Sequence, residues 1–292
     1  MCRTAAPIGC VHSCKGLKLN EVYVYEEELV PAFSQAIFQG CCQDVECMIF
    51  LYREETRPEC GGALIGALEI DGVLPILWGL SVHCHLSPGA IPQLARALAR
   101  GTAPQLTDLS IDYCGDSDLE ALADMMEVRA RLPNCKGLER FVGDSRRSCW
   151  FDETAQATRI RLVRALLPSV KYLPLTWTES YELCFREIKA PYLTYINCLY
   201  GENGIILSSN ALEAAPELSR IAISTMTRNK LSGGALLSVS AAMRHGALQK
   251  LEELEMHHCA GDGKDVRELM DALKASGCAR WLISAFMIVS LL

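Results

Sequence analysis

PQLTDLSIDYCGDSDLEALADMMEVRARL, residues 104–132, combines the pattern of a short strand with that of a helix. Its first half places apolar residues at Leu106, Leu109 and Ile111, an alternation typical of a strand with one buried face. Its second half carries an apolar stripe at helical spacing, formed by Leu119, Leu122, Ala123, Met126 and Ala130. A single strand and helix cannot bury these faces alone, so the stretch predicts copies of itself on either side.

The strand pattern recurs along the chain as an apolar residue, two others, a second apolar residue, one other and a third. The second apolar residues of these copies are Val22, Met48, Leu80, Leu109, Phe141, Leu173, Ile196, Ile221 and Leu254. The eight intervals between them average 29 residues. An ordinary α/β protein is the alternative, but its strands would contain longer runs of Val and Ile. The short strands and the regular period therefore favour a repeat protein.

The segments between the strands have the pattern of helices. Residues 90–100, 234–244 and 265–275 are amphipathic, and a glycine follows each within two residues: Gly101, Gly246 and Gly277. Glycine just past the last helical residue is a common C-terminal cap. Residues 154–167 form a further predicted helix, which Pro168 ends. We therefore expect strands and helices to alternate along the chain.

The repeated phrase resembles the leucine-rich repeat family in its ribonuclease-inhibitor-like class, whose phrase is Leu-x-x-Leu-x-Leu-x-x-Asn/Cys. Two copies match it position by position: Leu106, Leu109, Ile111, Cys114 and Leu251, Leu254, Met256, Cys259. His85 stands where the family has Asn or Cys, and the copies from 138 to 198 lack that polar residue. The resemblance implies an α/β solenoid, or horseshoe, with a parallel β-sheet on its concave face and helices on its convex face.

The resemblance covers about residues 17–285. It implies a single leucine-rich-repeat domain over residues 1–292, with nine to ten repeats, an N-terminal flank at 1–16 and an apolar C-terminal end at 281–292. A weak tenth copy lies around Leu282. Residues 134–138 (NCKGL) echo residues 13–17 (SCKGL), which leaves open a two-residue slip in the register of the first strand.

Alternate residues of a strand face opposite ways, so the residues between the apolar anchors point away from the helices. We predict that a partner protein binds this face. The predicted contact residues are Tyr23, Asp108, Asp112, Arg140, Tyr172, Tyr195, Arg220, Glu253 and Glu255. The centre of the hypothesis is the Tyr and Arg members from 140 to 220, because both residue types are enriched among interface hot spots. The alternative is that each is an ordinary residue of a solvated sheet.

Catalytic and metal-binding patterns are absent from the sequence. The P-loop, the Gly-x-Ser-x-Gly elbow and His-Glu-x-x-His do not occur. Histidines and cysteines gather at 10–14, 41–47, 83–85 and 257–259. Zinc needs about four converging ligands, whereas neighbouring residues of a strand point to opposite faces. We expect a protein that is not an enzyme and needs no metal or cofactor.

The composition indicates which classes of partner are not expected and which cellular compartment is favoured. The net charge is -7 and no Lys/Arg-rich run occurs, which argues against nucleic acid. No apolar run reaches the roughly 18 residues of a spanning helix, so a membrane partner is not expected. The chain has 15 cysteines, an odd number spread along its length, which favours reduced thiols in the cytosol or nucleus.

The resemblance also leaves regulatory functions open. The same repeat class occurs in GTPase activators, in substrate receptors of ubiquitin ligases and in larger repeat-containing receptors. Solenoids need polar terminal caps, but residues 281–292 are an apolar segment, WLISAFMIVSLL. The chain is therefore expected to be an interaction module, a regulatory protein of one of these kinds, or a fragment of a receptor.

Overall fold

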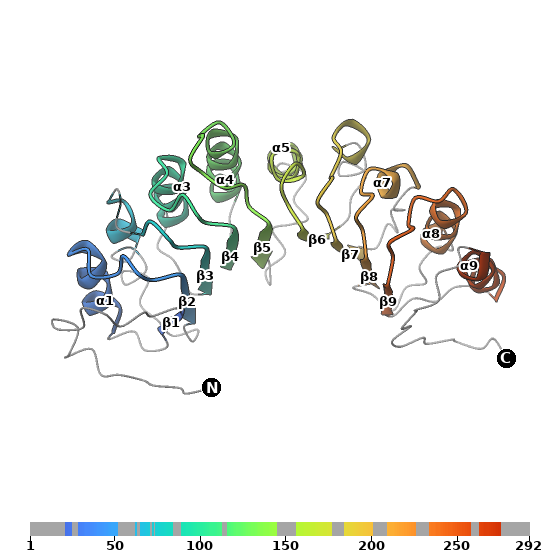
Figure 1. Cartoon of the computed structure of the whole chain (residues 1–292), viewed down its shortest axis with the longest axis horizontal. Coiled ribbons are helices and arrows are strands. Elements are labelled where there is room, and N and C mark those ends of the chain that lie inside the picture. The colour runs from blue at the N-terminus through green and yellow to red at the C-terminus, as the bar shows by residue number, and fades with distance from the viewer. Residues whose placement is uncertain are drawn as a thin grey trace. The chain divides into compact units, whose positions relative to one another are not determined.

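The computed structural model describes residues 21–24, 29–51, 62, 65–70, 72, 74–83, 89–112, 116–144, 156–176, 184–200, 209–225, 234–257 and 263–275 (Figure 1). The chain divides into two compact units. The first unit comprises Met1–Leu138 and Val142–Ala165, and the second comprises Glu139–Phe141 and Leu166–Leu292. The expected single domain over the whole chain remains a prediction.

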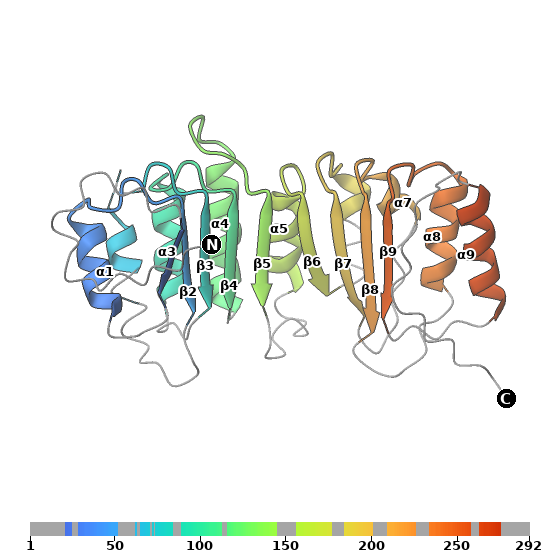
Figure 2. The same ribbon diagram turned by 60° about the horizontal axis from the view of Figure 1, so that its bottom comes forward.

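The first unit contains a parallel sheet with helices on one side (Figures 1 and 2). Its elements are β1 (Glu21–Val24), α1 (Leu29–Phe38), β2 (Cys47–Leu51), β3 (Gly79–His83), α3 (Ala90–Ala99), β4 (Asp108–Asp112), α4 (Asp116–Arg129) and all but the last residue of α5 (Gln156–Leu166). Val22, Met48, Leu80 and Leu109 lie opposite one another across β1 to β4. This pairing excludes the two-residue slip in the first strand.

The second unit has the same layers. Its elements are the first two residues of β5 (Arg140–Asp144), then β6 (Tyr172–Thr176), β7 (Tyr195–Tyr200), α7 (Ser209–Glu213), β8 (Arg220–Thr225), α8 (Gly234–Arg244), β9 (Glu253–His257) and α9 (Gly263–Ala275). The strands are parallel and lie in the order of the sequence. The predicted α/β solenoid, with alternating strands and helices, is confirmed in each unit.

The apolar anchors of the strands form the core beneath the helices. Met48, Leu80, Leu109, Ile196 and Leu254 are each at most 1% exposed. The stripe predicted on α4 is correct except at its end. Ala130 is exposed and follows the last residue of the helix, whereas Met125, which the stripe omitted, is buried. The helix ends one residue too early for Ala130 to continue the buried face.

Positive-φ glycines end several helices, as the sequence predicted. Gly101 follows α3 with φ 85° and Gly246 follows α8 with φ 76°. Only a residue without Cβ adopts this backbone without strain. Gly277 and the tenth copy around Leu282 lie outside the described residues.

A repeated backbone arrangement, the carbonyl ladder, precedes the strands. The carbonyl of Trp78 accepts hydrogen bonds from the N–H groups of Thr107 and Asp108, both at 2.9 Å. The residues whose carbonyls accept two successive N–H groups in this way are Glu46, Trp78, Glu139, Lys171, Thr194 and Ser219. Hydroxyls reinforce the ladder, since Thr194 Oγ1 donates to Lys171 O at 3.1 Å and Ser219 Oγ to Thr194 O at 3.2 Å. Each strand therefore starts at the level of the strand before it.

Arg129 lies at the C-terminal end of α4 and points into the first unit. Its side chain is buried, with 3% of the residue exposed. The guanidinium donates to four carbonyl oxygens, those of Leu98, Ala103, Leu106 and Lys136, at 3.1–3.3 Å. Burial lowers the pKa of Arg129, but an arginine remains protonated in proteins. The buried charge is thus solvated by backbone dipoles from both neighbouring connections.

Replacing Arg129 with Met should lower the free energy of unfolding by about 3 kcal/mol, because hydrogen bonds to a charged donor are lost and buried carbonyls are left without it. Denaturant unfolding followed by circular dichroism measures this change. Arg131→Met, at an exposed position two residues later, is the matched control and should change stability by less than about 0.5 kcal/mol. Equal effects of the two substitutions on the free energy of unfolding would refute the proposed stabilisation by the hydrogen bonds of Arg129.

Candidate functional site

Four planar side chains stack side by side on the open face of the second unit, the face of its sheet away from the helices. The guanidinium carbon of Arg140 lies 4.9 Å from the centroid of the Tyr172 ring. The Tyr172 and Tyr195 rings stack with centroids 4.5 Å apart and planes 15° from parallel. The guanidinium carbon of Arg220 lies 5.1 Å from the Tyr195 centroid. We call these four residues the Arg–Tyr stack.

The stack follows from the register of the sheet. Each member is the first residue of its strand, and Arg140, Tyr172, Tyr195 and Arg220 are direct partners across β5 to β8. Adjacent strands lie about 4.8 Å apart, which is close to the stacking distance of planar groups. Aromatic and cation–π contacts of this kind contribute about 0.5–1 kcal/mol each. The strand spacing itself therefore brings the four planes into contact.

Two carboxylates extend the row beyond Arg220. Glu253 lies opposite Arg220 on the next strand, β9. Its carboxylate forms an ion pair with Arg220 Nε at 2.8 Å. Glu255, two residues further along β9, pairs with a terminal nitrogen of the same guanidinium. The side chain of Glu255 is 16% exposed and that of Glu253 is 32% exposed. One cation is thus shared by two partly covered anions.

Burial and neighbouring side chains shift the pKa values of three residues in this row. Burial, followed by the neighbouring Tyr172, raises the pKa of Tyr195 to about 12, although Arg220 opposes the shift. Burial and hydrogen bonding with Glu255 raise the pKa of Glu253, and Arg220 again opposes the shift. Hydrogen bonding to Glu255 raises the pKa of Arg220. At neutral pH the tyrosine is therefore a hydrogen-bond donor and the arginine is charged.

The predicted contact residues fall into two groups. Arg140, Tyr172, Tyr195, Arg220, Glu253 and Glu255 come together in the second unit. Tyr23, Asp108 and Asp112 belong to strands of the first unit. Asp108 is partly exposed, and the side chains of Tyr23 and Asp112 lie outside the described part. The candidate site is therefore the first group.

Sequence reasoning missed an ion pair beside the stack. Lys171 Nζ lies 2.8 Å from Glu139 Oε2, and both residues immediately precede strands that carry stack members. The predicted face did not include the residue just before each strand. These residues recur along the chain at the same intervals as the apolar anchors. That spacing is the signal that would have identified the pair.

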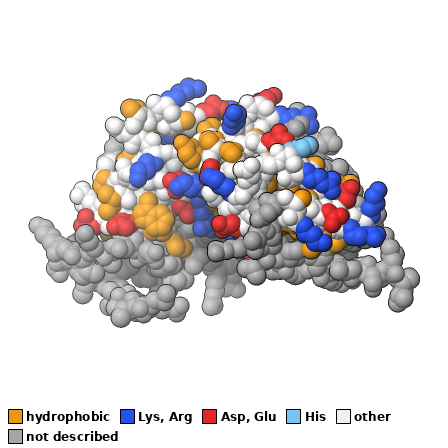
Figure 3. Space-filling model, turned by 45° about the vertical axis from the view of Figure 1, so that its right-hand side comes forward, with side chains coloured by type: hydrophobic (Ala, Val, Ile, Leu, Met, Phe, Trp, Pro, Cys, Tyr) orange, Lys and Arg blue, Asp and Glu red, His pale blue; other side chains and the backbone are white. Residues whose placement is uncertain are grey.

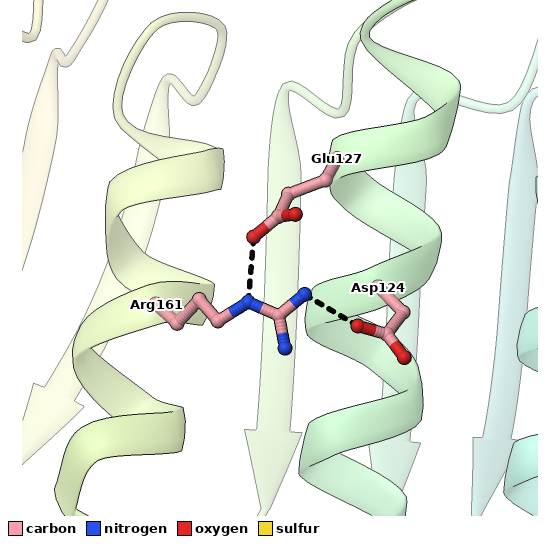
Figure 4. A network of polar contacts seen from close by, with 3 residues as sticks. All are labelled: Asp124, Glu127 and Arg161. Atoms are coloured by element: carbon pink, nitrogen blue, oxygen red, sulfur yellow. Dashed lines mark hydrogen bonds and ion pairs between the residues drawn. The ribbon is translucent and has the colours of Figure 1, made fainter.

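A second polar network lies on the helices of the first unit (Figure 4). Arg161 of α5 pairs with Glu127 of α4 through Nε at 2.7 Å and also with Asp124 through a terminal nitrogen. The hydrogen bond from Arg161 lowers the pKa of Glu127. The three side chains are 37–59% exposed, and exposed ion pairs contribute at most about 1 kcal/mol. We interpret the network as a weakly stabilising contact between α4 and α5.

Positive and negative side chains are mixed on the described part of the surface that Figure 3 shows. Figure 3 shows Lys and Arg side chains next to Asp and Glu. On α9, for example, Lys264, Arg267 and Lys274 alternate with Glu268 and Asp271. No basic stripe of the kind that follows a nucleic-acid backbone is seen there.

Within the ranges that the structure describes, no group of three or more His, Cys, Asp or Glu residues could hold a metal ion. Cys41, Cys42 and Cys135 are among the cysteines that form no disulfide. Burial raises the pKa of Cys42 to about 11, so this thiol is a weak nucleophile. The group at 10–14 and parts of the groups at 83–85 and 257–259 lie outside the described residues.

None of the helices that the structure describes is both long enough and apolar enough to cross a membrane.

Comparison with protein-family models and with curated protein sequences gives no match. Among solved structures, the chain is similar to a protein of Bacteroides fragilis, a target of the Northeast Structural Genomics Consortium. The two share 11% sequence identity with a TM-score of 0.47, over 93% of this chain and 76% of the other.

Replacing Arg220 with Gln should raise the pKa of Glu253 further, because it removes the cation that opposes the shift. NMR titration of the glutamate carboxyl carbons measures this change. A carboxyl whose folded-state pKa is raised destabilises the fold once ionised, and this effect disappears as the pH falls through that pKa. Lys250→Gln, which breaks a neighbouring ion pair with Glu217, is the control and should leave Glu253 unchanged. A lower pKa of Glu253 in Arg220→Gln would contradict the assignment.

Proposed function

We propose that this chain is a non-catalytic binding module, and that the open face of its second unit holds a partner protein with the Arg–Tyr stack at the centre of contact. We further propose that its repeats are leucine-rich repeats of the ribonuclease-inhibitor-like class. Its compartment is the cytosol or the nucleus, a proposal that rests on the number and spacing of its cysteines.

The observation that carries the proposal is the preorganisation of the stack. Ordering a long side chain on binding costs about 0.5–1.5 kcal/mol. Here each guanidinium is already held against a ring at about 5 Å, and the two rings hold each other. A partner that contacts the exposed edges of these groups therefore orders little. Tyr and Arg in such a position are typical of interface hot spots.

The chemistry of the stack supports binding over catalysis. A general base needs a pKa near the working pH, whereas the pKa of Tyr195 is raised to about 12. Arg220 is held as a cation between two carboxylates. The hydroxyls and guanidinium N–H groups act as donors, which fit the carboxylates or backbone carbonyls of a partner.

Tyr172→Ala and Tyr195→Ala should each weaken binding of the partner by about 30-fold, the equivalent of about 2 kcal/mol at a hot spot. The partner is first captured from cell extract by a photo-cross-linking residue placed at 192, a position outside the stack, identified by mass spectrometry and then produced in pure form. Calorimetric titration of the purified partner measures the affinity.

The matched control is Tyr192→Ala. Tyr192 is 57% exposed and lies three residues before Tyr195, in the turn that leads into β7, outside the stack. We expect this variant to bind like the unsubstituted protein. An affinity that is unchanged by Tyr172→Ala and Tyr195→Ala, or that falls equally in Tyr192→Ala, would reject the stack as the contact centre.

A further inference from the structure

We infer that the two carboxylates of β9, Glu253 and Glu255, are positioning residues of the proposed binding face. They hold the Arg220 guanidinium against the Tyr195 ring, and the partner protein contacts the arginine rather than the carboxylates. This inference rests on the proposed function, in which the Arg–Tyr stack is the centre of contact. It gives the two glutamates a part in binding that they exert through Arg220.

The register of β8 and β9 brings both carboxylates to the same guanidinium. Glu253 lies opposite Arg220, and its carboxylate pairs with Nε at 2.8 Å. Glu255 is two residues further along β9, so its side chain leaves the same face of the sheet. It lies opposite Ala222, a buried residue of β8. The small side chain of Ala222 leaves room for Glu255 to reach diagonally to a terminal nitrogen of Arg220.

The three neighbours of Arg220 restrict different movements of its guanidinium. Tyr195 lies against the flat face, with the guanidinium carbon 5.1 Å from the ring centroid, and this contact alone permits rotation in the plane and sliding across the ring. The carboxylates engage two of the three nitrogens, Nε and a terminal one. Because the donors of a guanidinium form a rigid planar fork, fixing two nitrogens fixes the whole group.

Stacking on Tyr195 is too weak to order the arginine by itself. The side chain of Arg220 is 45% exposed, and an exposed cation–π contact contributes less than the rotamer freedom that an ordered arginine loses. Hydrogen bonds between ionised groups are stronger than neutral ones. The carboxylates of Glu253 and Glu255 are 32% and 16% exposed, so solvent weakens their ion pairs less than those of fully exposed groups. They supply the attraction that keeps Arg220 in the stack.

The difference in exposure also separates the two roles. Arg220 is the most exposed of the three side chains and Glu255 the least. A partner protein that lies on the open face therefore reaches the arginine more readily than the carboxylates that hold it.

The positioning is measured on the full chain, without a partner, by NMR of isotope-labelled arginine. The ring current of Tyr195 shifts the side-chain signals of Arg220 upfield, and Tyr195→Leu gives their position without the ring. The signals are assigned by their absence from Arg220→Lys. We expect the double variant Glu253→Ala/Glu255→Ala to lose most of the upfield shift.

Two further variants make the NMR measurement specific. Glu253→Gln/Glu255→Gln keeps an oxygen acceptor at both positions, so it should retain more of the shift than the alanine pair, and it replaces the alanine pair if that variant does not fold. Glu217→Ala, which breaks the neighbouring ion pair with Lys250, is the control and should keep the whole shift.

Calorimetric titration with the purified, cross-linked partner protein separates positioning from direct contact. Glu253→Ala/Glu255→Ala should weaken binding about fivefold, the loss expected when one long side chain must be ordered on binding. On an Arg220→Ala background the same two substitutions should cause no further loss, because the residue through which they act is gone. Glu217→Ala should leave the affinity unchanged.

An upfield shift of Arg220 that survives in both glutamate double variants would overturn the inference. A loss of affinity that is as large on the Arg220→Ala background as in the unsubstituted chain would also overturn it, since the carboxylates would then contact the partner directly. The proposed function fails on a different result, an affinity that Tyr172→Ala and Tyr195→Ala leave unchanged. The NMR measurement needs no partner, so the two failures are distinguishable.

Discussion

Within each unit, the register of the strands depends on the carbonyl ladder. At six steps, one carbonyl before a strand accepts the N–H groups of two successive residues in the following repeat, as Lys171 O does from Thr194 and Tyr195, both at 3.0 Å. The hydrogen bonds fix where the next strand begins. Because buried backbone groups must be paired, a shift of one residue would break both bonds and would also turn the anchors toward solvent.

The ladder explains how repeats of unequal length maintain one register. The intervals between successive anchors range from 23 to 33 residues. Even so, the first residue of each strand lies directly opposite the first residue of the next strand, from β1 to β4 and from β5 to β9. Differences in length are taken up between strand end and ladder, where the helices and connections lie. The Arg–Tyr stack is a consequence, because its planes meet only if Arg140, Tyr172, Tyr195 and Arg220 share one level.

Buried and exposed arginines have different roles in this chain. Arg129 is buried and bound by four backbone carbonyls, so it stabilises the connections around α4. Arg161 forms exposed ion pairs between two helices, where solvent weakens the interaction. Arg220 combines a stacked face with two carboxylate partners. Arg220 is therefore held by stacking on one neighbouring strand and by ion pairs to the other.

The sequence by itself determined the strands, their buried anchors such as Leu109 and Leu254, and the residues on the open face. These follow from a period of two within strands and about 29 between them, and both periods are local properties of the chain. Only the tertiary structure decided that the stack rings lie 4.5 Å apart, that Arg220 joins two glutamates and that Arg129 reaches four carbonyls. It also divided the predicted contact residues between two units. Those contacts depend on side-chain direction and on which distant repeats are neighbours. Neither is encoded in the spacing of apolar residues.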